Sequence, residues 1–450
     1  MNKYKNKKIV IWGLGLHGGA LGVTKFLADL GAKLLVTDLR DAKTLKPTLQ
    51  KLKKYKNIKY VLGEHREKDF FDADFIVANQ AIKPNNHLFR KLKKSHKQIL
   101  SEIGLFYEFN KAMVVGITGT KGKSTITALV YELLKQEIKQ KNPFLANYNK
   151  VFLGGNIRKS VFNTLKKSDQ HSIVVIELSS YQLEQAKYMK QSPHISIISN
   201  IMPEHLDWHQ TMDNYIKAKT LIFKFQHKND FVILPHNLKY LGSKAKSQVL
   251  YFNGSNQDAV YKFGSIFHIK DQNINKVLKN FKGLEGRQQF IAKINGVNFY
   301  NDTCATHPAA TLYALKKFQN PIIIWGGVDK GADIKLLAKT FEQRKIRVVL
   351  FPGSASEKML KLLHKEYRQN FIKSATSIHQ AVQDAFKWAK KGDNILLSPG
   401  AASFNMFLNE FDRGKHFNQE VKKLQKQFSA NYKNKKLSKQ QIIKKTKTVI

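Results

Sequence analysis

The sequence predicts an α/β protein of three domains, each built around a mainly parallel sheet. Apolar runs of strand length alternate with helix-length stretches along the 450 residues, a pattern typical of repeated strand–helix units. Turns that contain glycine or proline follow several of these runs. A chain of this length also exceeds what one hydrophobic core usually supports, so more than one domain is expected.

Residues 1–109 are expected to form the first domain, which opens with a strand, a glycine-rich loop, a helix and a second strand. The loop reads Gly13-x-Gly15-x-x-Gly18, and the second strand ends at Asp38. Taken alone, this spacing matches the fingerprint of dinucleotide-binding domains. The basic start before an apolar stretch is similar to a signal peptide, but the glycines in that stretch argue against export. Strands are expected at 8–12, 33–37, 59–62, 75–78 and 98–100.

A second glycine-rich loop carries the strongest signal in the chain. It reads Gly116-Ile117-Thr118-Gly119-Thr120-Lys121-Gly122-Lys123-Ser124-Thr125, between an apolar strand and a helical pattern. Glycines let the backbone curl round an anion, and the N–H groups of the helix N-terminus point at it. Lys123 suits nucleotide phosphates, and the hydroxyl of Ser124 or Thr125 suits Mg²⁺. The loop predicts a central, nucleotide-binding domain of the P-loop kind at residues 110–286.

Two further segments of the central domain follow predicted strands. Glu177 ends the apolar run 173–176, where a carboxylate suits Mg²⁺; capping of the next helix is the alternative. His205 follows the strand at 195–199 and is either a metal ligand or a surface histidine. Another strand is expected at 231–234. Residues 250–270 are expected to form short strands joined by turns.

The third domain is expected at residues 287–428. It starts with a hairpin at 290–300, whose turn is Asn295-Gly296. The later strands end in glycine- or proline-containing turns, where ligands of open α/β sheets bind. Cys304 is not expected to be a nucleophile, because no general base is assigned to it. Residues 429–450 are expected to form a basic tail, either disordered or loosely helical. The later strands are expected at 321–325, 348–351 and 395–397.

Composition limits the classes of partner and compartment. The formal net charge is +44, which attracts polyanions, but only 9 of the 77 basic residues are arginines, the residues that read bases through paired contacts. We therefore expect solvated lysine-rich faces and no specific nucleic-acid site. The single cysteine excludes a disulfide framework, and no apolar run reaches the length of a membrane span. These features favour a cytoplasmic protein.

Four segments together resemble the Mur ligases, a family of ATP-dependent, amide-forming enzymes of peptidoglycan synthesis. Further segments are similar to the branch of the family that adds D-glutamate. The resemblance implies a Rossmann-like first domain that holds a UDP-sugar and no dinucleotide, a central P-loop ATPase domain, and a Rossmann-like C-terminal domain. The four family segments are 119–125, 177–183, 200–207 and 301–307, and the branch segments are 13–18, 37–40, 326–333, 397–404 and 409–414.

The resemblance implies that ATP phosphorylates the carboxylate of UDP-N-acetylmuramoyl-L-alanine and that D-glutamate attacks the acyl phosphate. It implies catalytic roles for Lys123, Glu177, His205 and Lys219, the last matching a lysine that the family carbamylates with CO₂. Residues implied to hold ATP are Gly119, Thr120, Lys121, Gly122, Lys123, Ser124, Thr125, Arg287 and Asp302. Residues implied to hold the UDP-sugar are Leu16, His17, Thr37, Asp38, Arg40, Asn79, Asn156 and Gln182. D-Glutamate is implied at Thr306, Lys330 and Ser403, and two Mg²⁺ ions at Ser124, Glu177, His205 and Lys219.

Some positions depart from the family pattern. Asn79-Gln80-Ala81 stands where Ser-Pro-Gly is usual, and His17 stands where threonine is common, so altered contacts to UDP are expected. Relatives also carry an asparagine- and alanine-rich helix that helps to hold adenine, before the equivalent of residues 281–287. We expect that helix to be missing here, because residues 267–275 lead almost directly into 275–281.

Two other functions stay open. One is a sibling ligase, such as a folylpolyglutamate synthase or another Mur enzyme, although the domain before the phosphate loop argues against the folate enzymes. The other is a non-catalytic, polyanion-binding descendant, which the retained catalytic residues argue against. We expect a monomer that acts on UDP-N-acetylmuramoyl-L-alanine, D-glutamate and ATP, with at most a weak membrane contact through the tail.

Overall fold

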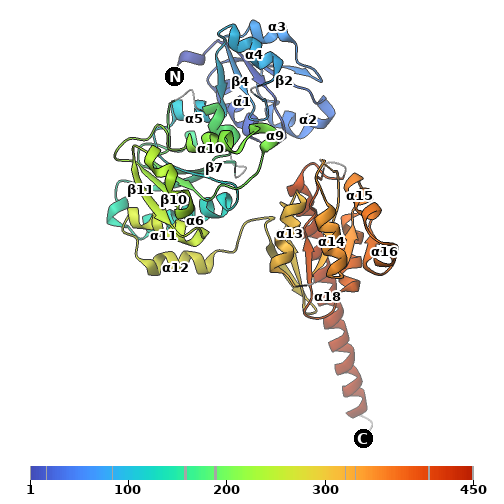
Figure 1. The fold of residues 1–450 in the computed structure, drawn as a ribbon. Coiled ribbons are helices and arrows are strands. Elements are labelled where there is room, and N and C mark those ends of the chain that lie inside the picture. Colours follow the sequence, from blue (N-terminus) through green and yellow to red (C-terminus); the bar gives the residue numbers. More distant parts are fainter. Residues whose placement is uncertain are drawn as a thin grey trace. The chain divides into compact units, whose positions relative to one another are not determined.

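The computed structural model describes residues 2–16, 18–83, 85–156, 160–186, 190–319, 321–329, 331–403 and 406–447. The chain divides into two compact units, Met1–Phe281 and Lys282–Ile450. The first unit contains two sheets and the second contains one (Figure 1). The predicted α/β fold with three mainly parallel sheets is confirmed, whereas the exact domain boundaries stay a prediction.

The first sheet has five parallel strands in the order β3-β2-β1-β4-β5. Its central strand is buried at all positions but the first, which is why it reads as a continuous apolar run. The strands are β1 (Lys8–Trp12), β2 (Lys33–Asp38), β3 (Ile58–Leu62), β4 (Phe75–Ala78) and β5 (Ile99–Ser101). The helices are α1 (Gly19–Asp29), α2 (Ala42–Leu49), α3 (Glu67–Phe71), α4 (His87–Lys94) and α5 (Glu102–Phe109), with 3₁₀ turns η1 (Asn2–Tyr4) and η2 (Gln50–Leu52).

The second sheet has six parallel strands in the order β11-β10-β9-β6-β8-β7. Its strands are β6 (Met113–Thr118), β7 (Lys150–Gly155), β8 (Ser172–Glu177), β9 (Ile195–Ile198), β10 (Phe231–Pro235) and β11 (Gln248–Phe252). Its helices are α6 (Lys123–Lys139), α7 (Phe162–Leu165), α8 (Ser180–Ala186), α9 (Leu206–His209), α10 (Met212–Thr220), α11 (Asn256–Ile266) and α12 (Asp271–Asn280), with 3₁₀ turns η3 (Pro143–Leu145) and η5 (His236–Lys244). Strand β7 was not predicted.

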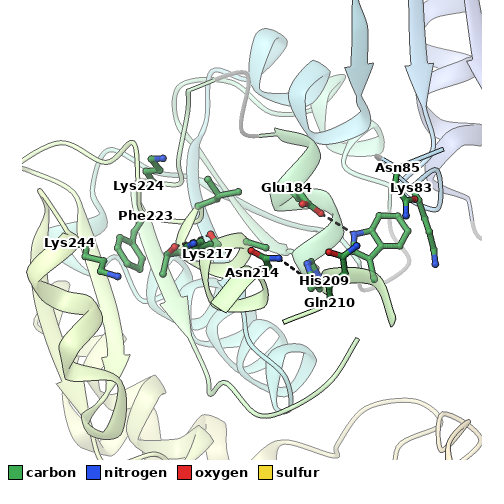
Figure 2. Close-up of a pocket in the computed structure, with 14 residues that line it drawn as sticks. Lys83, Asn85, Glu184, His209, Gln210, Asn214, Lys217, Phe223, Lys224 and Lys244 are labelled. Carbon is green, nitrogen blue, oxygen red and sulfur yellow. Dashed lines mark hydrogen bonds between the residues drawn. The ribbon is translucent and has the colours of Figure 1, made fainter. Parts of the chain in front are cut away.

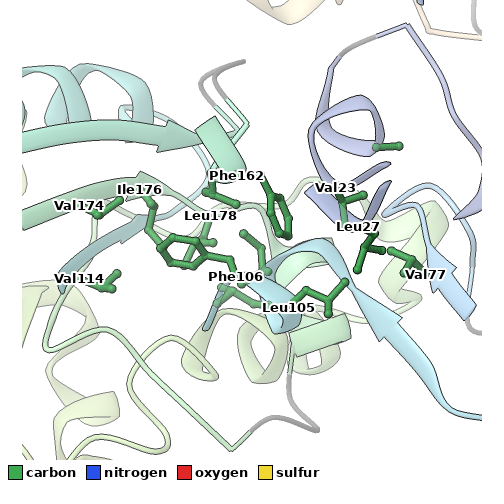
Figure 3. Packing of buried hydrophobic residues seen from close by; sticks show 14 of the residues in the cluster. Val23, Leu27, Val77, Leu105, Phe106, Val114, Phe162, Val174, Ile176 and Leu178 are labelled. Atoms are coloured by element: carbon green, nitrogen blue, oxygen red, sulfur yellow. The ribbon is translucent and has the colours of Figure 1, made fainter. Parts of the chain in front are cut away.

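One hydrophobic cluster runs through both sheets of the first unit (Figure 3). Phe106 of α5 is fully buried in it, with Leu27 of α1 on the side of the first sheet and Ile176 of β8 on the side of the second. Phe26 of α1 also packs against Phe162 of α7, with ring centroids 4.9 Å apart. This shared core fixes the glycine-rich loop of the first sheet relative to the phosphate loop of the second.

The third sheet has the order β12-β13-β17-β14-β15-β16, and only its first pair is antiparallel. That pair is the predicted hairpin, and both turn residues, Asn295 and Gly296, have positive φ as a tight turn of this type requires. The strands are β12 (Gln289–Ile294), β13 (Val297–Asn301), β14 (Ile322–Trp325), β15 (Val348–Leu350), β16 (Ile372–Ser374) and β17 (Asn394–Leu397). The helices are α13 (Pro308–Lys317), α14 (Lys335–Gln343), α15 (Ser354–Leu362), α16 (Lys365–Phe371), α17 (Ile378–Trp388) and α18 (Glu410–Lys447).

The last helix, α18, packs against the third sheet with its first half and extends beyond it with its second half. Its first half buries Phe417, Val421 and Leu424 in the core of the third sheet. Its backbone then continues as helix to Lys447, so the part of the predicted basic tail that the structure describes is helical. None of the helices in the described residues has the length and apolar character that a membrane crossing needs.

Candidate active site

The phosphate loop has the predicted strand–loop–helix form. Strand β6 ends at Thr118 and helix α6 begins at Lys123. Gly119 and Gly122 have φ values of 144° and 83°, conformations that side chains rarely adopt. A side chain at Gly119 would collide with Ser199, and one at Gly122 would collide with Asn256. The loop therefore requires glycine at both positions.

The segment that follows strand β9 fixes the shape of this loop. Asn200 accepts a hydrogen bond from the Lys121 N–H through Oδ1 at 2.9 Å and donates to the Lys121 carbonyl through Nδ2 at 3.0 Å. Its own carbonyl accepts from the Thr120 N–H at 2.9 Å. The Thr120 hydroxyl lies 3.1 Å from the Tyr215 hydroxyl of α10. The loop is thus preorganised by two elements, the segment after β9 and helix α10.

Lys219 of α10 is buried directly beside the phosphate loop. Its side chain is 1% exposed, and Nζ donates to the Gly119 carbonyl oxygen at 2.7 Å. Nζ also lies 4.5 Å from the centre of the Tyr215 ring. Burial, and next the charge of Lys123, lower the pKa of Lys219 from 10.5 to about 6. A large fraction of its amine is therefore neutral at pH 7, and the neutral amine is the nucleophilic form.

Glu177 lies at the end of strand β8, in register with Ile117 of β6 and Gly155 of β7. Its carboxylate is buried, and Oε1 accepts from Asn156 Nδ2 at 2.9 Å. Within the described residues, Oε2 has no hydrogen-bond partner. A buried carboxylate oxygen without a partner needs an explanation, and a bound cation supplies one.

His205 lies in an aromatic wall next to the loop. Its ring centroid is 5.0 Å from that of Tyr181 and 6.3 Å from that of Tyr215. Its neighbour Glu204 forms an ion pair with Lys121 at 2.6 Å. No group of three His, Cys, Asp or Glu side chains forms a ready metal site in the described ranges. A metal here would therefore also need hydroxyl, carbamate, phosphate or water oxygens.

The candidates for the UDP-sugar in the first sheet surround the loop at 13–15. Asp38 is 4% exposed and accepts hydrogen bonds from the N–H groups of Gly15 and Arg40, both at 2.9 Å. Asn79 donates to the Gly13 carbonyl at 3.0 Å. Thr37 is buried beside them, and its carbonyl accepts from the Gly13 N–H at 2.8 Å.

The other candidates for the UDP-sugar lie on both sheets of the first unit. Asn156 is held by Glu177, and Gln182 of α8 accepts from the Ser179 N–H at 3.0 Å. Gln185, on the same helix, donates to the Asn79 carbonyl at 3.2 Å and so links the two sheets. Leu16 is partly exposed next to the first loop, and His17 lies outside the described residues.

The third sheet brings its own candidates together at the carboxyl ends of its strands. Asp302 follows β13 and accepts from Ser398 Oγ at 2.9 Å and from the Gln288 N–H at 3.1 Å. Burial raises the pKa of Asp302 to about 6, against the lowering effect of these hydrogen bonds and of Arg287. Arg287 itself is exposed.

The residues expected to hold D-glutamate lie in the loops after β13 and β17. The Gly400 N–H donates to the Ala305 carbonyl at 2.7 Å, which joins the loop that carries Thr306 to the loop that carries Ser403. Ser403 is buried and Thr306 is partly exposed. Lys330 lies outside the described residues.

Three stretches of the chain match family profiles of Mur ligases. They are described as the Mur ligase MurD-like N-terminal domain (residues 7–101), the Mur ligase middle domain (117–305) and the Mur ligase glutamate ligase domain (286–400). A UDP-N-acetylmuramoylalanine--D-glutamate ligase of Borreliella burgdorferi is 35% identical over 94% of this chain and 99% of its own length. The chain belongs to the Mur ligase family. A Clostridioides difficile relative with the same name is 32% identical over 93% of this chain and 99% of its own.

Solved Mur ligases share the fold. MurF from Acinetobacter baumannii has a TM-score of 0.52 at 14% identity, covering 94% of this chain and 92% of its own. MurF from Thermotoga maritima, in complex with ADP, has a TM-score of 0.51 at 14% identity, covering 94% of this chain and all of its own. Family membership confirms the expectation of an ATP-dependent, amide-forming ligase of peptidoglycan synthesis.

Two expectations about the end of the Mur ligase middle domain are wrong. Short strands were expected beyond β11, but residues 256–266 form helix α11. The helix that was expected to be missing before residue 281 is therefore present. Ser255 caps α11 by accepting from the Asp258 N–H at 3.0 Å. Val260 and Phe263 bury one face of the helix in the core that also contains α6.

Asn256 and Arg413 were not proposed as site residues from the sequence. Asn256 opens α11 and lies against Gly122 of the phosphate loop. Arg413 is 1% exposed; it donates through Nη2 to the Thr303 carbonyl at 3.0 Å and through Nη1 to the Ala401 carbonyl at 3.2 Å. It thereby ties the two loops that carry Thr306 and Ser403. The sequence signal for α11 was a serine, Ser255, followed three residues later by an acidic residue, Asp258. No sequence signal indicated that Arg413 would be buried.

Proposed function

We propose that this chain joins D-glutamate to UDP-N-acetylmuramoyl-L-alanine, with ATP converting the alanine carboxylate into an acyl phosphate. The observation that carries the proposal is the arrangement of Lys123, Glu177 and Lys219 around one preorganised phosphate loop. The relatives that bear the name of this ligase, at 31–35% identity over nearly the whole chain, support the choice of substrates.

The loop would bind the phosphates of ATP. Lys123 Nζ now donates to the carbonyls of Gly119 and Thr120, both at 2.9 Å, from which it would turn to the β- and γ-phosphates. Thr125, Lys121 and the N–H groups of 119–124 would complete the cradle. Asn256, next to Gly122, would contact the nucleotide, in keeping with the family's asparagine-rich helix.

The oxygen atoms near the loop fit Mg²⁺. Glu177 offers the buried Oε2 that lacks a partner, and Ser124 offers a mostly buried hydroxyl at the start of α6. His205 and a carbamate on Lys219 would add ligands for a second ion. Bound Mg²⁺ would offset negative charge on the transferred phosphoryl group.

Carbamylation of Lys219 fits its surroundings. The neutral amine nitrogen attacks the carbon of CO₂, one C=O electron pair moves onto oxygen, and the proton on nitrogen passes to solvent. The product is an anion with hard oxygen donors, which Mg²⁺ prefers. In the unmodified side chain, burial beside Lys123 disfavours the ammonium form, so the reactive amine is available.

The first sheet suits a UDP-sugar better than a dinucleotide. In a dinucleotide site, the acidic residue after the second strand accepts from a ribose hydroxyl. Here the Asp38 carboxylate is buried and already accepts from Gly15 and Arg40. We propose that Leu16, His17 and Asn79 contact the diphosphate, and that 37–40 contact the uracil.

The third sheet would supply side chains for the second substrate and for ATP. Thr306, Lys330 and Ser403 would hold the carboxylates of D-glutamate, and Arg287 and Asp302 would contact ATP. The substrate amine then attacks the acyl carbon, the tetrahedral intermediate expels phosphate, and the surplus amine proton passes to solvent. Positioning and charge neutralisation carry such a reaction. We further propose a cytoplasmic monomer whose basic α18 extension makes at most a weak contact with anionic membranes.

An isotope-transfer experiment tests the acyl phosphate. UDP-N-acetylmuramoyl-L-alanine labelled with ¹⁸O in its carboxylate is incubated with ATP, Mg²⁺ and D-glutamate. The acyl-phosphate route carries one labelled oxygen into the released phosphate. Unlabelled phosphate with amide formation would contradict the route. No amide with D-glutamate, but amide with the substrate of another Mur enzyme, would favour the sibling ligase.

A further inference from the structure

A cavity of about 610 Å³ lies beside α10, away from the phosphate loop (Figure 2). Helix α10 carries Lys219 to the loop, whereas Asn214, Lys217 and Leu221 of the same stretch line the cavity. None of residues 116–125 lines it. Its volume is within the usual range of small-molecule sites.

The lining of this cavity is strongly cationic. It contains Lys83, Lys217, Lys224 and Lys244, and a single acidic residue, Glu184. In the described part of the chain, none of Lys217, Lys224 and Lys244 takes part in an ion pair. Unpaired cations around a hollow concentrate positive potential there, which favours a multiply charged anion.

The remaining walls restrict the kind of anion. The Glu184 carboxylate accepts from Trp208 Nε1 at 3.0 Å, so the acidic group is already engaged. Lys83 lies 5.7 Å from the centre of the Trp208 ring, and Phe223 forms another part of the wall. The hollow is partly open to solvent, and its volume of about 610 Å³ is that of a small-molecule site, which favours a compact anion over a polymer backbone.

We propose that this cavity binds a small phosphorylated molecule with at least two negative charges, at a site separate from the phosphate loop. Its lining includes Trp208, three residues after His205, and Ala218 and Thr220, the neighbours of Lys219 in the chain. Asn214 donates to the His209 carbonyl at 3.0 Å, so a ligand against Asn214 and Lys217 is one hydrogen bond from helix α9. Any effect on turnover rests on the proposed function; the binding itself does not.

The test uses the full chain with its phosphate loop saturated by ADP and Mg²⁺, and inorganic tripolyphosphate as the probe. Calorimetry measures binding, and tryptophan fluorescence reports on Trp208, because Trp208 lines the cavity whereas Trp12, Trp325 and Trp388 do not. We expect saturable binding with a change in tryptophan fluorescence. We expect the W208F variant to show the same heat of binding without that fluorescence change. Parallel ligase assays separate this proposal from the proposed function.

Charge-matched variants locate the site. The triple variant K217Q/K224Q/K244Q should weaken binding at least tenfold, whereas K139Q/K276Q/K279Q, with the same charge change on exposed residues of α6 and α12, should bind as the native chain does. Equal affinity of the two variants would overturn the proposal, as would tripolyphosphate binding that ADP abolishes. Tight binding of a short single-stranded RNA that depends on the same three lysines would identify a polymer as the occupant and would also overturn it.

Discussion

Lys123 and Lys219 donate to the same oxygen atom, the carbonyl of Gly119, at 2.9 and 2.7 Å. Two ammonium groups on one carbonyl repel each other, and burial adds to the cost of charging Lys219. The arrangement therefore favours the neutral amine at Lys219 before any cofactor binds. The proposed carbamate would remove one of the two positive charges and leave Lys123 for phosphate.

Replacing Lys219 by alanine is expected to abolish nearly all ligase activity, because the proposed second Mg²⁺ site would lose its carbamate oxygens. Short carboxylic acids such as formate or acetate are expected to restore part of the activity by filling the space. Lys228→Ala, which changes an exposed lysine that does not line the cavity described above, serves as the control. Full activity of the Lys219 variant in CO₂-depleted buffer would show that no carbamate is needed.

Glu177→Gln should keep the fold and lose catalysis. The amide oxygen still accepts from Asn156, but the neutral side chain no longer attracts Mg²⁺ through the Oε2 position. We expect kcat to fall on the order of a hundredfold or more, and the Mg²⁺ concentration for half-maximal rate to rise. An unchanged Mg²⁺ requirement with an unchanged melting temperature would remove Glu177 from the metal site.

Asn256→Ala should raise the KM for ATP and leave the KM for D-glutamate unchanged. The reason is its place against Gly122 at the start of α11. Gln257→Ala, at the next and more exposed position, is the matched control. Equal effects on both substrates would indicate that the variant disturbs the helix and not a nucleotide contact.

Glu102 gives the clearest dependence of stability on pH. Burial raises its pKa to about 7, although the hydrogen bond from Ser160 opposes the shift. Between pH 4.5 and 7 the Glu102 carboxyl stays protonated in the folded state but is ionised in the unfolded state. The free energy of unfolding therefore decreases as the pH rises through that range. Glu102→Gln should be more stable than the native chain at pH 8, by up to about 3 kcal/mol, and similar to it at pH 4.

Urea unfolding at the two pH values measures this effect, with the exposed Glu132→Gln as control. A Glu102→Gln variant whose stability relative to the native chain does not change between pH 4 and pH 8 would contradict the assignment.

Local patterns predicted the parts of the fold that carry a repeated signal. The strand at residues 8–12, the phosphate loop and the Asn295-Gly296 turn were all found where the sequence placed them. Helix α11 was missed because its aromatic and β-branched residues resemble strand composition, although Val260 and Phe263 are spaced for one helix face. Strand β7 was missed because it is an edge strand with mixed burial.

The sequence could not predict which polar and charged side chains are buried. Nothing in the local sequence distinguishes Lys219 from the other lysines; its 1% exposure and its contact with Gly119 do. Arg413 is a similar case, because its partners come from two loops that are distant in the sequence. Resemblance to a family located the first of these residues, and only the structure gave the reason for it.

The most direct test of the central claim is ADP formation from ATP with UDP-N-acetylmuramoyl-L-alanine and one amino acid at a time. The account predicts that D-glutamate supports turnover, that L-glutamate and meso-diaminopimelate do not, and that one ADP forms per amide bond. Equal turnover with L-glutamate, or ADP formation that needs no UDP-sugar, would contradict it.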